Sequence, residues 1–306
     1  MPPDISVILP VYNCREYVAQ SIQSIVEQSF DNFELIVING GSTDGTREVI
    51  EEFSDNRIRL VAHKKRFGLV ESRNEAVSLA SGNFIAFQDA DDLSQKHRLI
   101  KQYSEFVQND DLAVLGTSYF RFGENRRTVQ VTVKEKVSFK DLLTGMQLCN
   151  GSVMLRRQAM LNEGLFNSFF RQCEDYEFYL RLARKGYLIM NLQAPLYHLR
   201  EHPNRLSVSR WKEQALYLHI AQDVYSGYMS KEQLECSLQR DQKYLYSLLS
   251  PKLKKHYHLY LSRRYFESAD YPHGLLDLIR LAKLDPSEFA LNLANKILRS
   301  KNLRFK

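Results

Sequence analysis

Three carboxylates directly follow a short apolar segment, and they are the residues of this chain best suited to chemistry. Phe84–Phe87 has the composition of a buried strand, and Asp89, Asp91 and Asp92 come after it, with only Ala90 between the first two. Clustered carboxylates repel one another and resist desolvation, so a cluster at the end of a core strand needs compensating positive charge. Their hard oxygen atoms suit Mg²⁺ or Mn²⁺, and Mg²⁺ commonly shares its remaining positions with water and substrate phosphates. The motif therefore predicts a phosphorylated ligand bound through a divalent metal ion.

Alternating strands and helices are expected to position this cluster. Apolar runs predict strands, and helical spacing predicts the segments between them. The predicted strands are Ile5–Val11, Phe33–Ile38, Ile58–Ala62 and Phe84–Phe87, and the predicted helices are Glu16–Gln28, a helix capped by Thr43 or Asp44 that runs to Phe53, and Leu69–Ala80. This order is typical of an α/β protein with a parallel sheet and helices on both faces. Ligands bind such sheets beyond the carboxyl ends of the strands, where the loops at 12–14, 39–44 and 89–92 should form one crevice.

The middle of the chain is less regular, and its end is helical. The pattern predicts a helix over Leu93–Asn109, strands at Leu112–Gly116, Thr128–Val133, Ser152–Leu155 and Leu188–Leu192, and an amphipathic helix over Glu174–Arg184. After Trp211 only helical spacing remains, and Leu261–Pro286 resembles one tetratricopeptide-type hairpin. We expect a ligand-binding and catalytic domain over residues 1–210 and a helical region over 211–306.

Composition indicates an ordinary soluble protein of 306 residues, 44% hydrophobic and 25% charged. No stretch approaches the roughly 18 apolar residues that span a bilayer. The start of the chain leads straight into a predicted strand, so we expect no signal peptide. The four cysteines, Cys14, Cys149, Cys173 and Cys236, are scattered, which favours free thiols in a reducing compartment. The predicted location is the cytoplasm.

The net charge of +6 arises entirely after residue 210. Residues 1–210 carry 26 basic and 26 acidic side chains, whereas residues 211–306 carry 16 and 10. The tail Lys296–Lys306 holds five basic residues and no acid. Such a tail is compatible with nucleic acid, with an anionic membrane surface, or with a solvated helix end whose dipole favours cations. We expect the last two and no nucleic acid, which allows peripheral contact with the inner face of a membrane.

Six polar segments together carry a family resemblance. They are, in order, Ser6–Asn13, Gly41–Thr46, Glu71–Asn74, Gln88–Asp92, Glu174–Glu177 and Arg200–Asn204. Through them the chain resembles the inverting glycosyltransferases of family 2, which have the GT-A fold, a Rossmann-like, mostly parallel sheet with helices on both faces. The resemblance covers roughly residues 4 to 210, a domain-sized stretch.

The resemblance implies transfer of a hexose or N-acetylhexosamine from a nucleotide-sugar, with a UDP-sugar as the expected donor. The acceptor would be a hydroxyl of a glycan or of a lipid-linked glycan in surface polysaccharide synthesis. Mn²⁺ or Mg²⁺, held by Asp91, Asp89 and His202, would neutralise charge on the leaving diphosphate. Asp175 would be the general base that takes the acceptor's proton.

The resemblance also implies a nucleotide-sugar site with one departure from the family pattern. Its expected members are Pro10, Tyr12, Asn13, Asn39, Ser42, Arg73, Asp89, Ala90 and Arg200. Many relatives have two acids where this chain has Asn39 and Gly40, and the second acid commonly reads the base. Gly40 has no side chain, whereas the Asn39 amide can both donate to and accept from a uracil edge. Which nucleotide is bound therefore stays open at this point.

Each functional assignment has a structural alternative. Asp175 also suits a helix start for dipole reasons, with Glu174 and Glu177 as competing bases, and His202 suits a solvated loop. Arg73 could instead pair with Glu71 or Glu75 on the surface. A non-enzymatic reading is a degenerate transferase domain whose helical region recruits partners. A sugar nucleotidyltransferase would need a glycine-rich phosphate loop after the first strand, and residues 10–15 contain no glycine.

Overall fold

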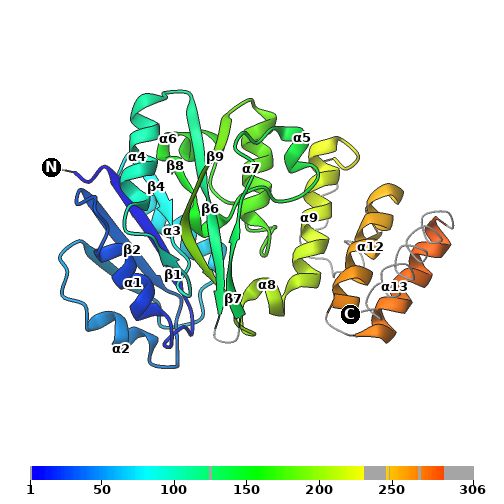
Figure 1. Cartoon of the computed structure of the whole chain (residues 1–306), viewed down its shortest axis with the longest axis horizontal. Helices are drawn as coiled ribbons and strands as arrows, with labels where there is room; N and C mark the ends of the chain where they lie inside the picture. The colour runs from blue at the N-terminus through cyan, green and yellow to red at the C-terminus, as the bar shows by residue number, and fades with distance from the viewer. Residues whose placement is uncertain (1, 124–125, 231–245, 248, 268–269, 286–306) are drawn as a thin grey trace. The chain divides into compact units, whose positions relative to one another are not determined.

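The computed structural model describes residues 2–123, 126–230, 246–247, 249–267 and 270–285 (Figure 1). The chain forms two compact units, Met1–Arg205 and Leu206–Lys306. The domain assignments predicted on either side of residue 210 stay predictions. The basic tail Lys296–Lys306 and Cys236 lie outside the described residues.

A single sheet, with nine strands in the described residues, forms the centre of the first unit. Its order is β3-β2-β1-β4-β8-β6-β9-β5, and β7 pairs with β6. The strands are β1 (Ile5–Val11), β2 (Phe33–Asn39), β3 (Ile58–Ala62), β4 (Phe84–Phe87), β5 (Leu93–Ser94), β6 (Leu112–Gly123), β7 (Arg126–Val131), β8 (Met154–Arg156) and β9 (Leu188–Arg200). The first four strands are parallel, whereas β8 runs antiparallel to β4 and to β6. The carboxyl ends of β1, β2 and β4 therefore meet at one edge of the sheet.

Helices cover both faces of this sheet, as the alternation of elements predicts. All seven residues of β1 are buried, which is typical of a strand between two helical layers. Alternate β1 residues pack with α1 (Val18–Val26), α2 (Thr46–Glu51) and α4 (Arg98–Gln108) in one core. The opposite face carries α3 (Leu69–Leu79), which contacts β1 and β2, and α7 (Glu174–Arg184), whose Phe178 joins the Phe87–Phe166 ring pair. Two short helices, α5 (Phe139–Leu142) and α6 (Arg157–Glu163), complete the unit.

Some predicted boundaries are confirmed and others are wrong. The bounds of β1, β3, β4 and α7 agree with the pattern. The helix predicted over Leu93–Asn109 begins only at Arg98, because Leu93 and Ser94 pair with β9 instead. The helix predicted to follow Thr43 or Asp44 begins at Thr46, after Gly45 in the left-handed region (φ 91°). Strand β9 continues to Arg200 because it follows β6 along its whole length.

The second unit is helical throughout the residues that the structure describes, as predicted. Its helices are α8 (Leu206–Ser209), α9 (Trp211–Ser226), α12 (Pro251–Glu267) and α13 (Tyr271–Leu284). Ala215 of α9 packs with Leu261 and Tyr265 of α12. Helices α12 and α13 pack against each other, and their likeness to a tetratricopeptide hairpin stays a prediction. None of the described helices has the length and apolar character needed to cross a bilayer.

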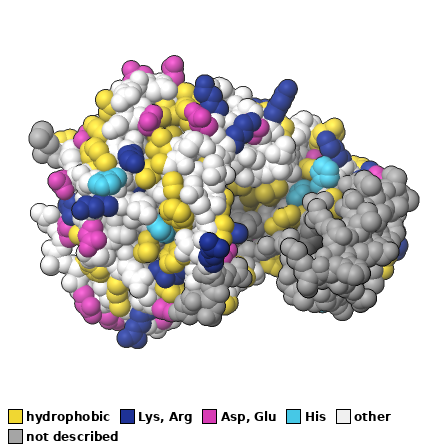
Figure 2. All heavy atoms as spheres, in the orientation of Figure 1, with side chains coloured by type: hydrophobic (Ala, Val, Ile, Leu, Met, Phe, Trp, Pro, Cys, Tyr) yellow, Lys and Arg dark blue, Asp and Glu magenta, His cyan; other side chains and the backbone are white. Residues whose placement is uncertain are grey.

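Charged side chains of both signs are intermixed over the first unit on the face that Figure 2 shows. This mixture agrees with the equal numbers of basic and acidic residues in positions 1–210. The electrostatic features that matter to the site are therefore local groups rather than a broad field.

Candidate active site

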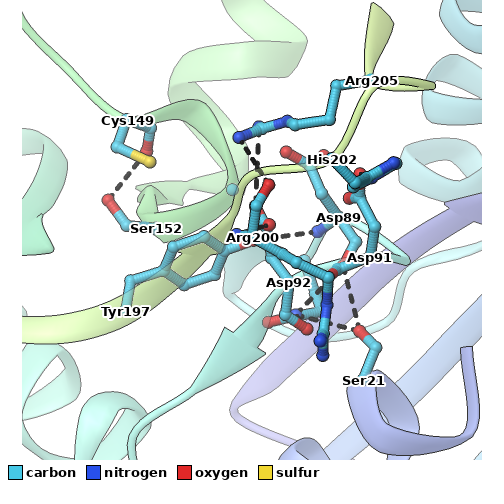
Figure 3. Close-up of polar contacts among 12 residues, drawn as sticks. Ser21, Asp89, Asp91, Asp92, Cys149, Ser152, Tyr197, Arg200, His202 and Arg205 are labelled. Atoms are coloured by element: carbon cyan, nitrogen blue, oxygen red, sulfur yellow. Dashed lines mark hydrogen bonds and ion pairs between the residues drawn. The ribbon is translucent and has the colours of Figure 1, made fainter. Parts of the chain in front are cut away.

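The three carboxylates of the predicted motif lie in the loop after β4, next to His202 and Arg205 (Figure 3). Each carboxylate pairs with a basic side chain from another part of the first unit. The closest atom pairs are Arg73 Nη2 to Asp89 Oδ1 at 3.2 Å, His202 Nε2 to Asp91 Oδ2 at 2.8 Å, and Arg205 Nη2 to Asp92 Oδ2 at 3.9 Å. The prediction that clustered carboxylates need positive charge beside them is thus met by side chains. The three partners come from α3 and from the segment after β9.

Burial affects the three carboxylates differently. It raises the pKa of Asp89, although Arg73 opposes the shift, and it raises the pKa of Asp92 well above its usual range, helped by the charge of Asp91. Burial also pushes the pKa of Asp91 upward, but the hydrogen bond from His202 and the charge of Arg205 outweigh it, so the pKa of Asp91 is lowered. Asp91 is therefore the member of the cluster that ionises most readily.

A buried glutamine anchors the main chain of this loop. Gln88 Nε2 lies within hydrogen-bond distance of the carbonyl oxygens of Asp89 (3.1 Å) and Asp92 (2.9 Å) and of Ser21 Oγ on α1 (3.0 Å). The Ser94 hydroxyl of β5 donates to Gln88 Oε1 at 2.6 Å. The loop is thus attached to two neighbouring elements by neutral hydrogen bonds, which leave its carboxylates free for other partners.

Arg200, at the end of β9, lies against the same loop. Its Nε donates to the carbonyl oxygen of Asp91 at 2.8 Å, and its Nη2 donates to Gln20 Oε1 at 2.6 Å. The guanidinium lies over the rings of Tyr17 and Phe122 at 4.8 and 4.7 Å. In this conformation Arg200 holds the carboxylate loop through its hydrogen bond to the main chain. The contact of Arg200 with a phosphate, expected from the sequence, stays a prediction.

Hydrogen bonds join the loops after β1 and β2, two of the loops that were predicted to line a crevice. Asn13, in the left-handed region (φ 47°), donates its N–H to Ser42 Oγ at 2.9 Å and accepts at Oδ1 from the Thr43 N–H at 2.9 Å. Asn39 Oδ1 accepts from the Ser42 N–H at 3.0 Å. Tyr12 is 40% exposed, and the guanidinium of Arg66 lies over its ring, 4.8 Å from the ring centre.

Close main-chain packing favours glycine at position 40, where the chain departs from the family pattern, and at the next position, Gly41. A Cβ on Gly40 would lie 2.8 Å from the carbonyl oxygen of Phe67, and Gly40 O accepts the Phe67 N–H at 3.0 Å. A Cβ on Gly41 (φ +80°) would lie 2.4 Å from Lys65 O. The segment after β3 thus occupies the space that an acidic side chain at position 40 would need. Asn39 is the adjacent residue that has a polar side chain.

The three acids at the start of α7 have different surroundings. Glu174 pairs with Arg73, and Glu177 pairs with Arg181 at 3.1 Å. Asp175 is less buried than either glutamate, and its Oδ1 accepts from the Tyr176 N–H at 2.7 Å. Burial raises the pKa of Asp175, and the charge of Arg73 opposes that rise. Asp175 is therefore the acid of this turn that an acceptor could reach.

Two residues of the site were not predicted from the sequence. Arg205 directly follows the polar segment Arg200–Asn204, so its position next to that segment was a signal. Gln88 precedes Asp89 directly, but nothing in a single sequence indicates that its side-chain amide bonds to the main chain of the loop. Of the remaining predicted residues, Pro10 and Ala90 are buried beside the crevice, so their side chains belong to the core.

The donor atoms at the carboxylate loop fit a hard divalent cation. Asp91 Oδ2 and His202 Nε2 are within one hydrogen bond of each other, and both groups are accepted ligands of Mn²⁺. His202 Nδ1 is buried and has no hydrogen-bond partner among the described residues. Nε2 is the ring nitrogen that faces Asp91, so a cation held by both groups would replace their present hydrogen bond. No three His, Cys, Asp or Glu side chains of the described residues already converge on one point.

Comparison with known proteins identifies relatives of the first unit. The family model described as glycosyl transferase family 2 matches residues 6–170. The putative glycosyltransferase EpsE of Bacillus subtilis is 35% identical over 207 residues, which cover 65% of this chain and 73% of EpsE. The UDP-Glc:alpha-D-GlcNAc-diphosphoundecaprenol beta-1,3-glucosyltransferase WfgD of Escherichia coli is 33% identical over 180 residues, covering 59% of this chain and 70% of WfgD.

Solved structures show the same fold at lower identity. TarS 1-349 of S. aureus in complex with UDP-GlcNAc aligns with a TM-score of 0.62 and 18% identity, covering 91% of each chain. The mannosyltransferase PcManGT of Pyrobaculum calidifontis, in complex with GDP-Man and Mn²⁺, aligns with a TM-score of 0.58 and 17% identity, covering 98% of this chain and 81% of PcManGT. These similarities establish the architecture of the chain.

Proposed function

The chain belongs to glycosyl transferase family 2, and from that premise we propose that it moves a sugar from a UDP-sugar to an acceptor hydroxyl with inversion at the anomeric carbon. The observation that carries the proposal is Arg73, which connects the carboxylate loop after β4 with the acidic first turn of α7. In this proposal, the connection links the loop that would bind the diphosphate with the helical turn that would supply the base. The acceptor would be a glycan or lipid-linked glycan of a surface polysaccharide, reached from the cytoplasm.

On the donor side, this chain's residues would bind and orient the nucleotide diphosphate. Tyr12, which is 40% exposed, would contact the nucleobase. Asn39 is 2% exposed and its Oδ1 accepts from the Ser42 N–H, so its amide would reach the nucleobase only if this loop rearranged. Asp91, with His202 and Asp89, would hold Mn²⁺ or Mg²⁺, which supplies positive charge to the departing diphosphate. Arg205 and Arg200 add cationic groups at the same loop.

On the acceptor side, Asp175 would act as the general base. The acceptor oxygen forms a bond to the anomeric carbon, the bond from that carbon to the diphosphate oxygen breaks, and the acceptor proton passes to the Asp175 carboxylate. A single displacement of this kind inverts the anomeric centre. The carboxylate needs to approach to about 3 Å from the hydroxyl.

The second candidate function is a degenerate transferase domain that only recruits partners through its helical unit. The pairing of each carboxylate with a basic group, rather than with solvent, argues for a retained site. The nucleotidyltransferase alternative still lacks a glycine-rich phosphate loop after β1.

A donor screen tests the proposal. The full chain is mixed with Mn²⁺ and each of several UDP-, GDP- and dTDP-sugars, and thermal unfolding and donor hydrolysis are measured. A donor at 100 times its Kd should stabilise the protein by about 2.7 kcal/mol. Asp91→Ala should abolish the metal-dependent shift and the hydrolysis, whereas Asp111→Ala, at an exposed carboxylate near α4, should not. Absence of any donor-dependent shift in the wild type would refute a UDP-sugar transferase.

A further inference from the structure

One guanidinium connects the two sides of the candidate site. Arg73 on α3 is 5% exposed; its Nη1 donates to Glu174 Oε1, and its Nη2 donates to Asp89 Oδ1 at 3.2 Å. The sequence alternatives, pairing of Arg73 with Glu71 or Glu75, are not what the structure shows. Instead, one terminal nitrogen of the guanidinium bonds to the start of α7 and the other bonds to the loop after β4.

Glu174 is placed to act on Arg73 and not on a substrate. Its side chain is 2% exposed and ends at the guanidinium, so it is closed to an acceptor hydroxyl. Burial raises the pKa of Glu174 to about 7, and the charge of Arg73 opposes that rise. Removing one member of such a buried pair leaves the other without compensation.

The first turn of α7 is held by contacts outside the helix, among them the Tyr176 hydroxyl, which donates to the Leu142 carbonyl oxygen. Cys173 precedes the helix and makes no side-chain capping bond. Asp175 bonds to the Tyr176 N–H of its own turn, so its direction follows the position of that turn. Among the described contacts of this turn, the bond from Glu174 to Arg73 is the one that reaches toward the carboxylate loop.

We propose that Glu174 is a positioning residue, which acts through Arg73 to hold Asp175 at a set place relative to the carboxylate loop. The inference rests on the proposed function, in which Asp175 receives the acceptor's proton and the loop holds the donor. Donor binding and proton removal would then depend on one shared side chain.

The test compares Glu174→Gln with Glu177→Gln in the full chain. Glu177 is a matched control, because it is 3% exposed, lies on the same helix and pairs with Arg181, away from Arg73. Hydrolysis of UDP-glucose and UDP-GlcNAc with Mn²⁺ gives kcat, calorimetry gives the Kd of UDP with Mn²⁺, and amide hydrogen exchange follows the first turn of α7.

For Glu174→Gln we expect kcat to fall about 10- to 100-fold while the Kd of UDP stays within about twofold. The amides of Asp175 and Tyr176 should exchange faster, whereas Glu177→Gln should preserve both kcat and exchange there. An equal fall of kcat in both variants would overturn the positioning role, because it would reflect general destabilisation. If the wild type neither binds nor hydrolyses any donor, the proposed function fails, and exchange alone decides: faster exchange confined to Glu174→Gln supports the positioning role, and unchanged exchange refutes it.

Discussion

At the scale of single residues, neighbouring acids on one helical turn differ in what they can do. Glu174 and Glu177 are buried and each pairs with an arginine, whereas Asp175 is partly exposed. Chemical identity does not separate these residues, because all three are carboxylates in the first turn. Helical geometry separates them, since side chains one and two positions apart point in different directions.

Replacing the proposed base tests this separation directly. Asp175→Asn should lower kcat for transfer about 10²- to 10⁴-fold, because the amide accepts no proton from the acceptor. The Kd of UDP with Mn²⁺ should remain close to that of the wild type, since Asp175 lies on the acceptor side. Steady-state kinetics and calorimetry measure the two effects. A kcat within about tenfold of wild type would assign proton removal to another group.

Gly40 is a residue whose side chain is excluded by its neighbours. Gly40→Ala places a methyl group 2.8 Å from the Phe67 carbonyl oxygen, so the segment after β3 must shift. We expect the free energy of unfolding to fall by about 1–3 kcal/mol in urea denaturation. Thr43→Ala, at an exposed position of the same loop, should change it by less than about 0.5 kcal/mol. Equal stabilities of the two variants would show that this segment yields without cost.

At the scale of elements, the carboxylate loop depends on helices and strands that flank it. Ser21 of α1 and Ser94 of β5 both bond to the Gln88 side chain, and Tyr197 of β9 accepts the Asp89 N–H at 3.2 Å. The short strand β5 therefore supports the carboxylate loop as well as pairing with the sheet. It brings a hydroxyl beneath the loop that bears the carboxylates.

Removing the glutamine amide should loosen this loop. Gln88→Leu leaves the carbonyl oxygens of Asp89 and Asp92 without that donor, so we expect a loss of about 1–3 kcal/mol in stability. The affinity for Mn²⁺, measured by calorimetry, should fall about tenfold or more because the ligands are less well positioned. Gln23→Leu, on the exposed side of α1, is the control with the same chemical change. Unchanged Mn²⁺ affinity in Gln88→Leu would contradict the anchoring role.

At the scale of the whole molecule, the chain joins a sheet unit to a helical unit with its own buried polar groups. His219 of α9 is buried, and its Nδ1 lies 2.7 Å from Ala215 O. Burial lowers the pKa of His219 from 6.5 to about 4. Because the unfolded chain binds the proton more readily, His219 contributes stability that is complete above pH 6.5 and is lost as the pH falls toward 4.

This linkage predicts acid sensitivity of the helical unit. The full shift corresponds to about 3 kcal/mol, and His219→Leu should flatten the dependence of unfolding free energy on pH between 6.5 and 4. Urea unfolding at several pH values, followed by hydrogen exchange in α9, measures it. A wild-type slope in His219→Leu would exclude this histidine as its source.

Helices and strands with a clear local pattern of apolar residues could be predicted from the sequence. The apolar runs of β1, β3 and β4 and the amphipathic spacing of α7 predicted these bounds, because burial on one or both faces imposes a periodic pattern on neighbouring residues. The order of strands and helices also placed the carboxylates at the carboxyl end of a parallel strand, next to the loops after β1 and β2.

The side chains that surround the carboxylate loop could be identified only from the three-dimensional structure. Leu93 and Ser94 form a strand because β9 pairs with them, and Arg73 turns from the surface into the site because Glu174 and Asp89 receive its guanidinium. The glycine at position 40 is explained by the Phe67 carbonyl oxygen across the crevice. Strand pairing and buried ion pairs are satisfied by residues distant in sequence, so no local pattern encodes them.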